Sequence, residues 1–202
     1  MQGPSSASGE PFAYTPPGSA PRGVVSLILG CMFSGKTTEL LRRVAAVPAP
    51  QVFAVKHAID MRFAGGAIVS HAGKAFPAVT VASAAEIVGL VGPQTALAAV
   101  DEAHFFDEGL VDVVRRLQAR GLDVVIASLE PDSWARSFPI NKSLRALADE
   151  CIVKHATCAR CGAVADRTQR LTPIIGGQMV VDPSNYEPRC QKCWQPPRES
   201  DE

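Results

Sequence analysis

The sequence predicts an α/β protein built on a mostly parallel sheet, followed by a small module of different character. Short apolar runs alternate with amphipathic stretches as far as residue 153, and this alternation of strands and helices is typical of a parallel sheet. From Cys158 onward, two cysteine pairs, Gly176-Gly177 and short β-like runs replace that alternation. A chain of 202 residues fits one domain with a small appendage.

Five apolar runs predict the strands of the sheet. The first run ends at Gly30, the third ends at Asp101, and the fifth precedes the cysteine-rich module. The expected strands are residues 24–29, 52–55, 96–100, 124–127 and 151–153.

Helical spacing of apolar residues predicts the helices between these strands. Residues 37–47 form one such stretch, which Pro48 would end. Residues 108–120 are amphipathic and stop at Gly121, a residue typical of helix ends. A further helical stretch is residues 144–148.

The segment between the second and third strands predicts a loop and a short helix. Residues 65–73 are small, polar and glycine-containing, which favours a loop. Ser83 and Glu86 have the spacing of a capping box, in which each side chain satisfies a backbone N–H at the start of a helix.

Both ends of the chain are polar and rich in proline. Residues 1–22 are mostly Pro, Ser, Gly and Ala, and only Glu10 and Arg22 are charged. Such a segment buries too little apolar surface to offset its chain entropy, so we expect a disordered tail. It lacks the basic start and apolar run of a signal peptide, which favours the cytoplasm. Residues 195–202 are expected to form a loose tail.

Composition excludes some classes of protein and disfavours others. No apolar stretch reaches the 18 or so residues that span a membrane. Twenty basic residues balance twenty acidic ones, whereas nucleic-acid binders usually carry a basic excess. Six cysteines in a reducing compartment indicate metal binding or chemistry rather than disulfides.

Residues 30–37 match the phosphate-loop pattern G-x-x-x-x-G-K-[ST]. The match follows an apolar strand and opens a helix, which is the context that this motif requires. Its glycines let backbone N–H groups face phosphates at a helix N-terminus. Lys36 would reach the β- and γ-phosphates, and the Thr37 hydroxyl would bind Mg²⁺. The residues expected to bind ATP here are Gly30, Ser34, Gly35, Lys36, Thr37 and Thr38.

Two carboxylates follow the third strand. In phosphate-loop enzymes an acid in the position of Asp101 commonly holds Mg²⁺, directly or through water. Glu102 lies where a general base could accept a proton from a hydroxyl nucleophile. The pair therefore indicates phosphoryl transfer onto an alcohol.

Cys158-x-x-Cys161 and Cys190-x-x-Cys193 supply four thiolates, which matches the tetrahedral preference of zinc. Because all four positions are filled by protein, we expect a structural site. The long spacing between the pairs predicts a small β ribbon. A redox pair is the alternative, although neither pair opens a helix in a βαβ unit. Cys31 and Cys151 are expected to be packing residues.

These motifs together resemble the thymidine kinases of the cellular, zinc-containing type. The similarity begins with residues 30–40 (GCMFSGKTTEL) and Arg42-Arg43, and it covers about residues 24–194 in matching order and spacing. The other matching motifs are Lys56…Asp60-x-Arg62, Ser70-His71-x-Gly73, Asp101-Glu102-Ala103-x-Phe105-Phe106, Cys158-x-x-Cys161, Thr168-x-Arg170, Tyr186 and Cys190-x-x-Cys193.

The resemblance implies ATP-dependent phosphorylation of the 5′-hydroxyl of thymidine, giving thymidine monophosphate in nucleotide salvage for DNA synthesis. It implies a RecA-like phosphate-loop domain over residues 23–155, a zinc-bound lasso domain over residues 156–194, and a homotetramer.

The resemblance also implies roles for individual residues. Glu102 would be the general base and Asp101 the metal-associated acid, while Asp60 and Arg62 would lie near the phosphates. The lasso would hold the base through main-chain groups. The implied nucleoside-binding residues are Met32, Phe105, Leu129, Thr168, Val180, Val181 and Tyr186.

Several departures from the family pattern cluster around the implied nucleoside pocket. His104 replaces the usual Gln, and Glu130 replaces the usual Asp. Ser133 stands where an aromatic residue is expected, with Trp134 beside it. Val181-Asp182 stands where the family has Gly-Gly. These changes leave the ATP chemistry intact and leave open another deoxynucleoside as the substrate.

Two functions of other classes also remain open. One is a phosphate-loop ATPase or GTPase switch with a zinc interaction module. The other is a zinc-ribbon nucleic-acid binder, which neutral charge and few aromatic residues disfavour. Residues 101–104 spell a helicase box, but the chain has no room for a second motor domain.

Overall fold

The structure, a computed structural model, describes residues 22–60, 66–173 and 182–198. Its centre is a six-stranded sheet of order β5-β2-β6-β7-β1-β8, in which every neighbouring pair is parallel. The strands are β1 Val25–Gly30, β2 Val52–His57, β5 Val79–Val81, β6 Leu97–Asp101, β7 Asp123–Leu129 and β8 Glu150–Lys154. The predicted α/β fold with a parallel sheet is confirmed.

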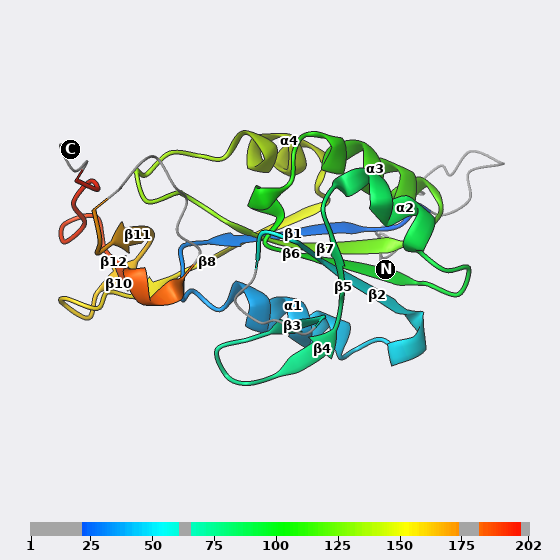
Figure 1. The fold of residues 1–202 in the computed structure, drawn as a ribbon, viewed down its shortest axis with the longest axis horizontal. Coiled ribbons are helices and arrows are strands. Elements are labelled where there is room, and N and C mark those ends of the chain that lie inside the picture. The colour runs from blue at the N-terminus through cyan, green and yellow to red at the C-terminus, as the bar shows by residue number, and fades with distance from the viewer. Residues whose placement is uncertain (1–21, 61–65, 174–181, 199–202) are drawn as a thin grey trace, which may run out of the picture.

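Helices cover both faces of this sheet (Figure 1). Helix α1 (Lys36–Val44) lies on one face, together with a hairpin of β3 (Ala67–Val69) and β4 (Ala75–Pro77). The other face carries α2 (Ile87–Leu90), α3 (Gly109–Ala119) and α4 (Pro139–Leu147). The short 3₁₀ helices are η1 Ala49–Gln51, η2 Ala84–Glu86, η3 Ala103–Phe105 and η4 Pro183–Asn185.

Strand β1 is buried along its whole length because it has partners on both sides and helices on both faces. Leu27 and Leu29 belong to the apolar core that includes residues of α3 and α4, whereas Ile28 belongs to the core that includes residues of α1. Each such side chain contributes roughly 1.5–3 kcal/mol on burial. The carboxyl end of β1 is therefore anchored on every side.

Helix α1 begins and ends for local reasons. Gly35 precedes it with a φ of 82°, a left-handed conformation that glycine adopts without steric strain. The helix ends at Val44, three residues before the predicted boundary. The N–H groups of Ala46 and Val47 bond to carbonyls three residues back, which tightens the chain into turns ahead of Pro48.

Three predictions in the sheet-forming part need correction. The predicted loop at residues 65–73 contains β3, which pairs with β4, so within residues 66–73 the irregular part is Gly66 and the turn after β3. Strand β5 was not predicted, because its three residues are too short for a pattern. Helix α4 starts at Pro139, five residues before the predicted 144, since proline is favoured in the first turn.

The capping box at Ser83 and Glu86 is confirmed, although it opens the 3₁₀ helix η2 before the chain enters α2. The predicted helix at residues 108–120 matches α3, and the last predicted strand matches β8 with one more residue at each end.

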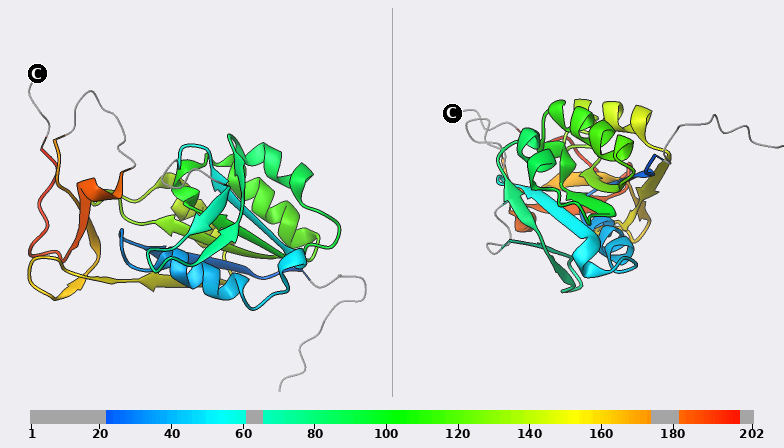
Figure 2. Two further views of the ribbon diagram at one scale, coloured as in Figure 1. Left: turned by 60° about the horizontal axis from the view of Figure 1, so that its bottom comes forward. Right: turned by 90° about the vertical axis from the view of Figure 1, so that its right-hand side faces the viewer.

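Beyond one end of the sheet, the chain forms a second layer of short strands (Figure 2). Strand β9 (Ala156–Thr157) pairs with β10 (Val164–Ala165), and β11 (Arg167–Arg170) pairs with β12 (Tyr186–Arg189). Both pairs are antiparallel. The β ribbon predicted between the cysteine pairs is thus present.

The ends of the chain fit the predictions only in part. The predicted disordered tail lies outside the described residues except for Arg22, which pairs with Asp149 at 2.6 Å. The predicted loose tail at residues 195–202 is described as far as residue 198. Its first part is attached rather than loose, because the Gln195 N–H donates to Gln169 Oε1 at 2.8 Å and Pro197 is buried. Within the described ranges, no helix combines the length and apolar character needed to cross a membrane.

Candidate active site

The loop predicted to bind phosphate lies between the end of β1 and the start of α1. Gly30 has a φ of 155°, and a Cβ there would lie 2.3 Å from the Lys154 carbonyl oxygen and 2.6 Å from Ser34 Oγ. Only glycine fits this position, because β8 and the loop itself press against it. Lys36 is almost fully buried, and its ammonium donates to the Cys31 carbonyl across the loop at 2.9 Å.

Ser34 offers an independent sign that the loop receives a ligand. Its hydroxyl is buried without a hydrogen-bond partner among the described residues. Leaving a buried polar group unsatisfied costs about 1–3 kcal/mol, so native structures rarely tolerate it without a reason. A phosphate oxygen in the loop would satisfy this hydroxyl.

The acid predicted to hold Mg²⁺ lies beside the loop. Asp101 ends β6, is 5% exposed, and its two carboxylate oxygens lie 3.4 and 3.3 Å from Thr37 Oγ1. A hydroxyl and a carboxylate at this separation offer the oxygen ligands that Mg²⁺ takes in nucleotide sites. The donor set therefore fits a magnesium ion shared with a nucleotide.

The second acid, Glu102, has an unusual backbone. Its φ and ψ are 51° and 46°, a left-handed conformation that costs a non-glycine residue about 1–2 kcal/mol. Strain of this kind collects at functional sites. The side chain is about 10% exposed, and its Oε2 lies 3.4 Å from Nδ1 of His104. Glu102 and Asp101 follow β6 directly, as the sequence predicts.

Asp60 and its neighbour Lys56 lie at the carboxyl end of β2, next to β6. Asp60 is 5% exposed, and its carbonyl oxygen accepts from Lys56 Nζ at 3.3 Å. Lys56 is 2% exposed and lies in register with Asp101. Arg62, predicted to lie near the phosphates, is outside the described residues.

The predicted nucleoside-binding residues that the structure describes come from five separate segments. Met32 in the phosphate loop donates its N–H to Thr168 Oγ1 of β11 at 3.1 Å. The ring of Phe105 packs against the ring of His104, with 4.1 Å between their centroids. The Leu129 N–H donates to Nδ1 of His104. Tyr186 lies half-buried on β12, where burial raises the pKa of its phenol. Val180 and Val181 lie outside the described residues.

The family departure at Glu130 has a structural role. Its carboxylate accepts hydrogen bonds from Ser137 Oγ, from Asn141 Nδ2 at 2.5 Å and from the Phe138 N–H at 3.4 Å. Asn141 is fully buried and also donates to the Leu129 carbonyl at 2.7 Å. The acid thus fastens the start of α4 to the end of β7. At Ser133, the other departure nearby, the carbonyl oxygen accepts from Trp194 Nε1 at 3.3 Å.

Two residues of this region were not among the predicted site residues. Lys56 could have been found, because a charged residue at the end of an apolar strand is conspicuous in the sequence. Asn141 left no such signal, since it lies ahead of the helix predicted at residues 144–148 and a polar residue in such a segment normally faces solvent.

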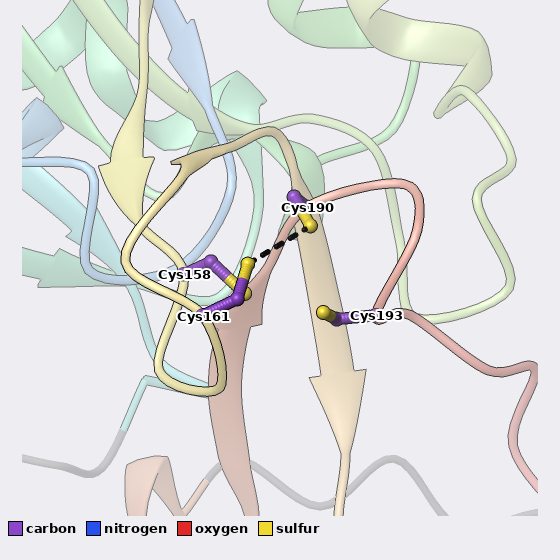
Figure 3. Close-up of side chains that lie close together, drawn as sticks. All are labelled: Cys158, Cys161, Cys190 and Cys193. Atoms are coloured by element: carbon purple, nitrogen blue, oxygen red, sulfur yellow. Dashed lines mark hydrogen bonds between the residues drawn. The ribbon is translucent and has the colours of Figure 1, made fainter.

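The two cysteine pairs converge in space, as predicted (Figure 3). The sulfur atoms of Cys158, Cys161, Cys190 and Cys193 all lie within 4.8 Å of one another, and those of Cys161 and Cys190 are 3.6 Å apart. Four thiolates 2.3 Å from one zinc ion lie about 3.8 Å apart. The cluster therefore fits a tetrahedral zinc ion with no position left for water.

Backbone turns hold each cysteine pair. The Gly162 N–H donates to the Cys158 carbonyl at 2.9 Å, and the Cys193 N–H donates to the Cys190 carbonyl at 3.0 Å. The thiols share protons: burial works to raise the pKa of Cys158, but hydrogen bonds, the largest from the Cys190 backbone, lower it, whereas hydrogen bonds with Cys161 and Cys190 raise the pKa of Cys193. Thiolate is the form that binds zinc.

The two remaining cysteines differ from this cluster. Cys31 is buried in the phosphate loop, where its thiol contacts the Ala165 carbonyl at 3.5 Å and burial raises its pKa. Cys151 is exposed on β8, so its predicted role in packing is wrong.

The glycine-rich loop joins strand β1 to helix α1, and a carboxylate lies at the end of β6, the second strand along the sheet from β1. Phosphate-loop proteins bind nucleotides at a site of this kind. The fold and the loop define this chain as a phosphate-loop protein. A model of the thymidine kinase family matches residues 23–194. The chain therefore belongs to the thymidine kinase family.

Curated bacterial relatives agree with this assignment. The chain is 38% identical to a thymidine kinase of Rhodothermus sp. (strain ITI 518), over 87% of this chain and 83% of that protein. It is 37% identical to a thymidine kinase of Bacteroides fragilis, over 86% of this chain and 88% of the relative. The thymidine kinase of Bdellovibrio bacteriovorus is also 37% identical, over 87% of each chain.

Proposed function

We propose that this protein transfers the γ-phosphoryl group of ATP to the 5′-hydroxyl of thymidine, giving thymidine monophosphate for DNA synthesis. The observation that carries the proposal is the pairing of a phosphate loop with two buried carboxylates at the end of β6. Membership of the thymidine kinase family supports the choice of nucleoside.

ATP would bind with its phosphates in the loop. The proposed contacts are the backbone N–H groups at the start of α1, the Lys36 ammonium and the Ser34 hydroxyl. Thr37 and Asp101 would hold Mg²⁺, which neutralises charge on the phosphates when it is bound. Gly30, Gly35 and Thr38 complete the loop, and Asp60 and Arg62 are proposed to lie near the phosphates.

Glu102 would act on the acceptor. As the 5′-oxygen forms its bond to the γ-phosphorus and the bond from that phosphorus to the ADP oxygen breaks, the hydroxyl proton passes to the Glu102 carboxylate. The carboxylate is nearly buried, so water competes little for the proton. General-base help of this kind is typically worth ~10²–10⁴-fold in rate.

The nucleoside would lie between the phosphate loop and the second layer of strands. The hydrogen bond from Met32 to Thr168 supports this location, because it joins those two parts at one point. The residues proposed to contact the nucleoside are Met32, Phe105, Leu129, Thr168, Val180, Val181 and Tyr186.

The four-cysteine cluster is proposed to hold a structural Zn²⁺. We further propose that residues 23–155 form the ATP-binding domain and residues 156–194 the zinc-bound lasso domain. A location in the cytoplasm and an assembly of four chains complete the proposal, and the assembly rests on the family resemblance.

One assay tests the proposed activity. Purified protein is incubated with Mg²⁺ and ATP alone, with added thymidine, and with each other deoxynucleoside in turn. We expect ADP release that depends on thymidine and matches thymidine monophosphate formed, mole for mole. ADP release without any nucleoside would indicate a nucleotide-hydrolysing switch, and a preference for another deoxynucleoside would overturn the choice of thymidine.

A further inference from the structure

The second layer of strands contains a cavity that no step of the proposed reaction uses. Its volume is about 330 Å³, and it is lined by residues of β11, of β12 and of the chain that follows Cys193. Gln169 of β11 fixes one wall, because its Nε2 donates to the Gln195 carbonyl at 2.9 Å and its Oε1 accepts from the Gln195 N–H at 2.8 Å. The cavity is therefore held open by defined hydrogen bonds, and its volume is that of a small-molecule site.

The lining of this cavity is strongly basic. Four arginines line it, and the described lining residues include no acid. Arg189 pairs with Glu187 of the same strand, whereas the other three have no carboxylate partner among the residues that the structure describes. Because basic and acidic residues are equal in number over the whole chain, this excess is local and favours an anion in the cavity. The four arginines are Arg160, Arg170, Arg189 and Arg198.

Arg170 supplies a guanidinium that is already fixed. The residue is buried, and its Nε donates to the Thr172 carbonyl at 3.1 Å while its Nη2 donates to the Pro173 carbonyl at 3.2 Å. Its Nη1 has no partner within the described part of the chain. A guanidinium held by its other nitrogens has little freedom left to lose when it binds an anion.

Arg160 and Arg198 supply two further guanidiniums at the rim of the cavity. Both residues are exposed, and the side chain of neither bonds to any described residue. Arg160 lies between Cys158 and Cys161, so its charge also offsets the negative charge of the proposed zinc–thiolate cluster. Arg170 and Arg198 lie outside both cysteine turns, so that cluster does not account for them.

The chemistry of the lining favours phosphate over carboxylate. A guanidinium donates two parallel N–H bonds to an oxyanion, and a phosphate group has more oxygen acceptors and more negative charge than a carboxylate with which to meet several guanidiniums. Leu171, Pro173 and Pro196 also line the cavity and offer an apolar surface to the rest of a ligand.

We propose that this cavity binds the phosphate groups of a small molecule. It is separate from the phosphate loop, because neighbouring residues of a strand face opposite sides. Thr168 of β11 accepts from Met32 of that loop, whereas the next residue, Gln169, lines the cavity. The inference goes beyond the proposed phosphorylation of thymidine and does not depend on it.

Calorimetry with pyrophosphate tests the site on the full-length protein. The variants are Arg198→Ala and the double variant Arg160→Ala/Arg198→Ala, which remove exposed side chains on which the fold does not depend. Arg115→Ala/Arg116→Ala is the matched control, because it removes two exposed charges from α3. All titrations are made in about 0.15 M salt, which screens diffuse attraction between charges.

We expect the unaltered protein to bind pyrophosphate both in the cavity and in the phosphate loop. The double variant should weaken one of these two affinities by at least about tenfold and leave the other unchanged. Arg198→Ala should weaken the same affinity, and the control should bind as the unaltered protein does. Zinc content, measured by elemental analysis, and the KM for ATP should not change in Arg198→Ala.

Repeating the titrations with ADP distinguishes the two sources of phosphate groups. An affinity that depends on the two arginines and is at least about tenfold higher for ADP than for pyrophosphate would assign the cavity to a nucleotide. Any smaller gain would assign it to free phosphates.

Four outcomes overturn the inference. Pyrophosphate binding that is unchanged in the double variant would show that the arginines hold no anion, and an equal loss in the control would indicate general attraction between charges. Loss of zinc from Arg198→Ala would show that this arginine serves the cysteine cluster. A raised KM for ATP in Arg198→Ala would place its effect at the phosphate loop.

Discussion

At the scale of single residues, Glu102 combines a strained backbone with a nearly buried carboxylate. Its left-handed conformation turns the chain at the end of β6, so that Asp101 and Glu102 do not simply alternate as strand residues do. Asp101 contacts Thr37, and Glu102 contacts His104. The turn is therefore what divides the two acids between Thr37 of the phosphate loop and His104.

Replacing Glu102 with Gln tests the proposed base directly. The amide keeps the size of the side chain but cannot take a proton, so kcat should fall by ~10²–10⁴-fold. Binding of ATP and thymidine should be largely preserved, as expected when an interaction made only in the transition state is lost. Steady-state kinetics with both substrates measure this. Glu108→Gln, at an exposed position before α3, is the control and should behave as the unaltered protein.

Replacing Gly30 with Ala tests the close packing of the phosphate loop. A methyl group there has no room beside the Lys154 carbonyl, so the loop must shift. We expect weaker ATP binding by at least tenfold, measured by calorimetry, and a lower thermal midpoint. Gly89→Ala is the control, since its Cβ would meet nothing within 4 Å. Unchanged ATP affinity in Gly30→Ala would show that the loop does not hold the phosphates.

Residue types in a short pattern could be predicted from the sequence, whereas contacts across the fold could not. Gly30, Lys36 and Asp101 lie at ends of apolar strands or in a motif, so their positions follow from local order. The link from His104 to Leu129 joins residues 25 positions apart, and it depends on how η3 packs against β7. Nothing in local sequence encodes that distance.

At the scale of elements, ion pairs fasten α1 to the edge of the sheet. Arg43 on α1 bonds to Glu39 at 3.1 Å and to Glu150 of β8 at 2.7 Å. Arg42 adds a second pair to Glu39 at 2.7 Å. Hydrogen bonds from Arg42 and then Arg43, against the opposing effect of burial, lower the pKa of Glu39 to about 2.

A pH-dependent loss of stability should follow when Glu39 is replaced by Gln. Because the folded pKa is depressed, the ionised carboxylate stabilises the fold fully above the unfolded pKa near 4.5. This contribution is lost as the pH falls towards 2. We expect Glu39→Gln to be less stable by about 1 kcal/mol at pH 7, a value limited by solvent screening, and the difference to shrink below pH 4.5.

Urea unfolding of both proteins over a pH series measures that difference. Asp112→Asn is the control, because the Asp112–Arg115 pair is exposed on both sides and should contribute less than about 0.5 kcal/mol. A difference for Glu39→Gln that stays constant from pH 7 to pH 3 would contradict the assignment.

Elements with a strong pattern were predictable, and short or tertiary-dependent elements were not. The apolar runs of β1, β2, β6 and β7 are continuous because both faces of the sheet are covered. The start of α4 depends on Glu130, which accepts hydrogen bonds from groups at the N-terminus of that helix. Pro139 is a local signal for the first turn of a helix, but Glu130 lies on the far side of a loop, so the sequence around Pro139 does not reveal its hydrogen bonds.

At the scale of the whole molecule, the zinc cluster should determine whether the second layer of strands is ordered. Replacing Cys161 with Ser removes one of four thiolates, and zinc binding is coupled to folding in modules of this size. We expect the variant to lose most of its zinc, measured by elemental analysis against one ion per unaltered chain. Thymidine phosphorylation should fall with it, because Thr168 then no longer steadies Met32.

Cys151→Ser provides the matched control for zinc content. Cys151 is exposed on β8 and lies outside the four-cysteine cluster, so its loss should change neither metal content nor activity. Carefully purified, unaltered protein that contains no zinc would contradict the assignment of the site.

The hydrogen bond between Met32 and Thr168 spans 136 positions of the chain, and this has a consequence for synthesis on the ribosome. Strand β1 is the first strand of the six-stranded sheet to be synthesised, yet its partners β7 and β8 are the last two strands of that sheet. A nascent chain must therefore carry the apolar β1 without partners until most of the protein has emerged. Contacts so distant in sequence form slowly and leave apolar segments open to aggregation. Production of active protein should accordingly depend on chaperones, and a message cut short before β7 should yield insoluble fragments, because β1 then has neither partner.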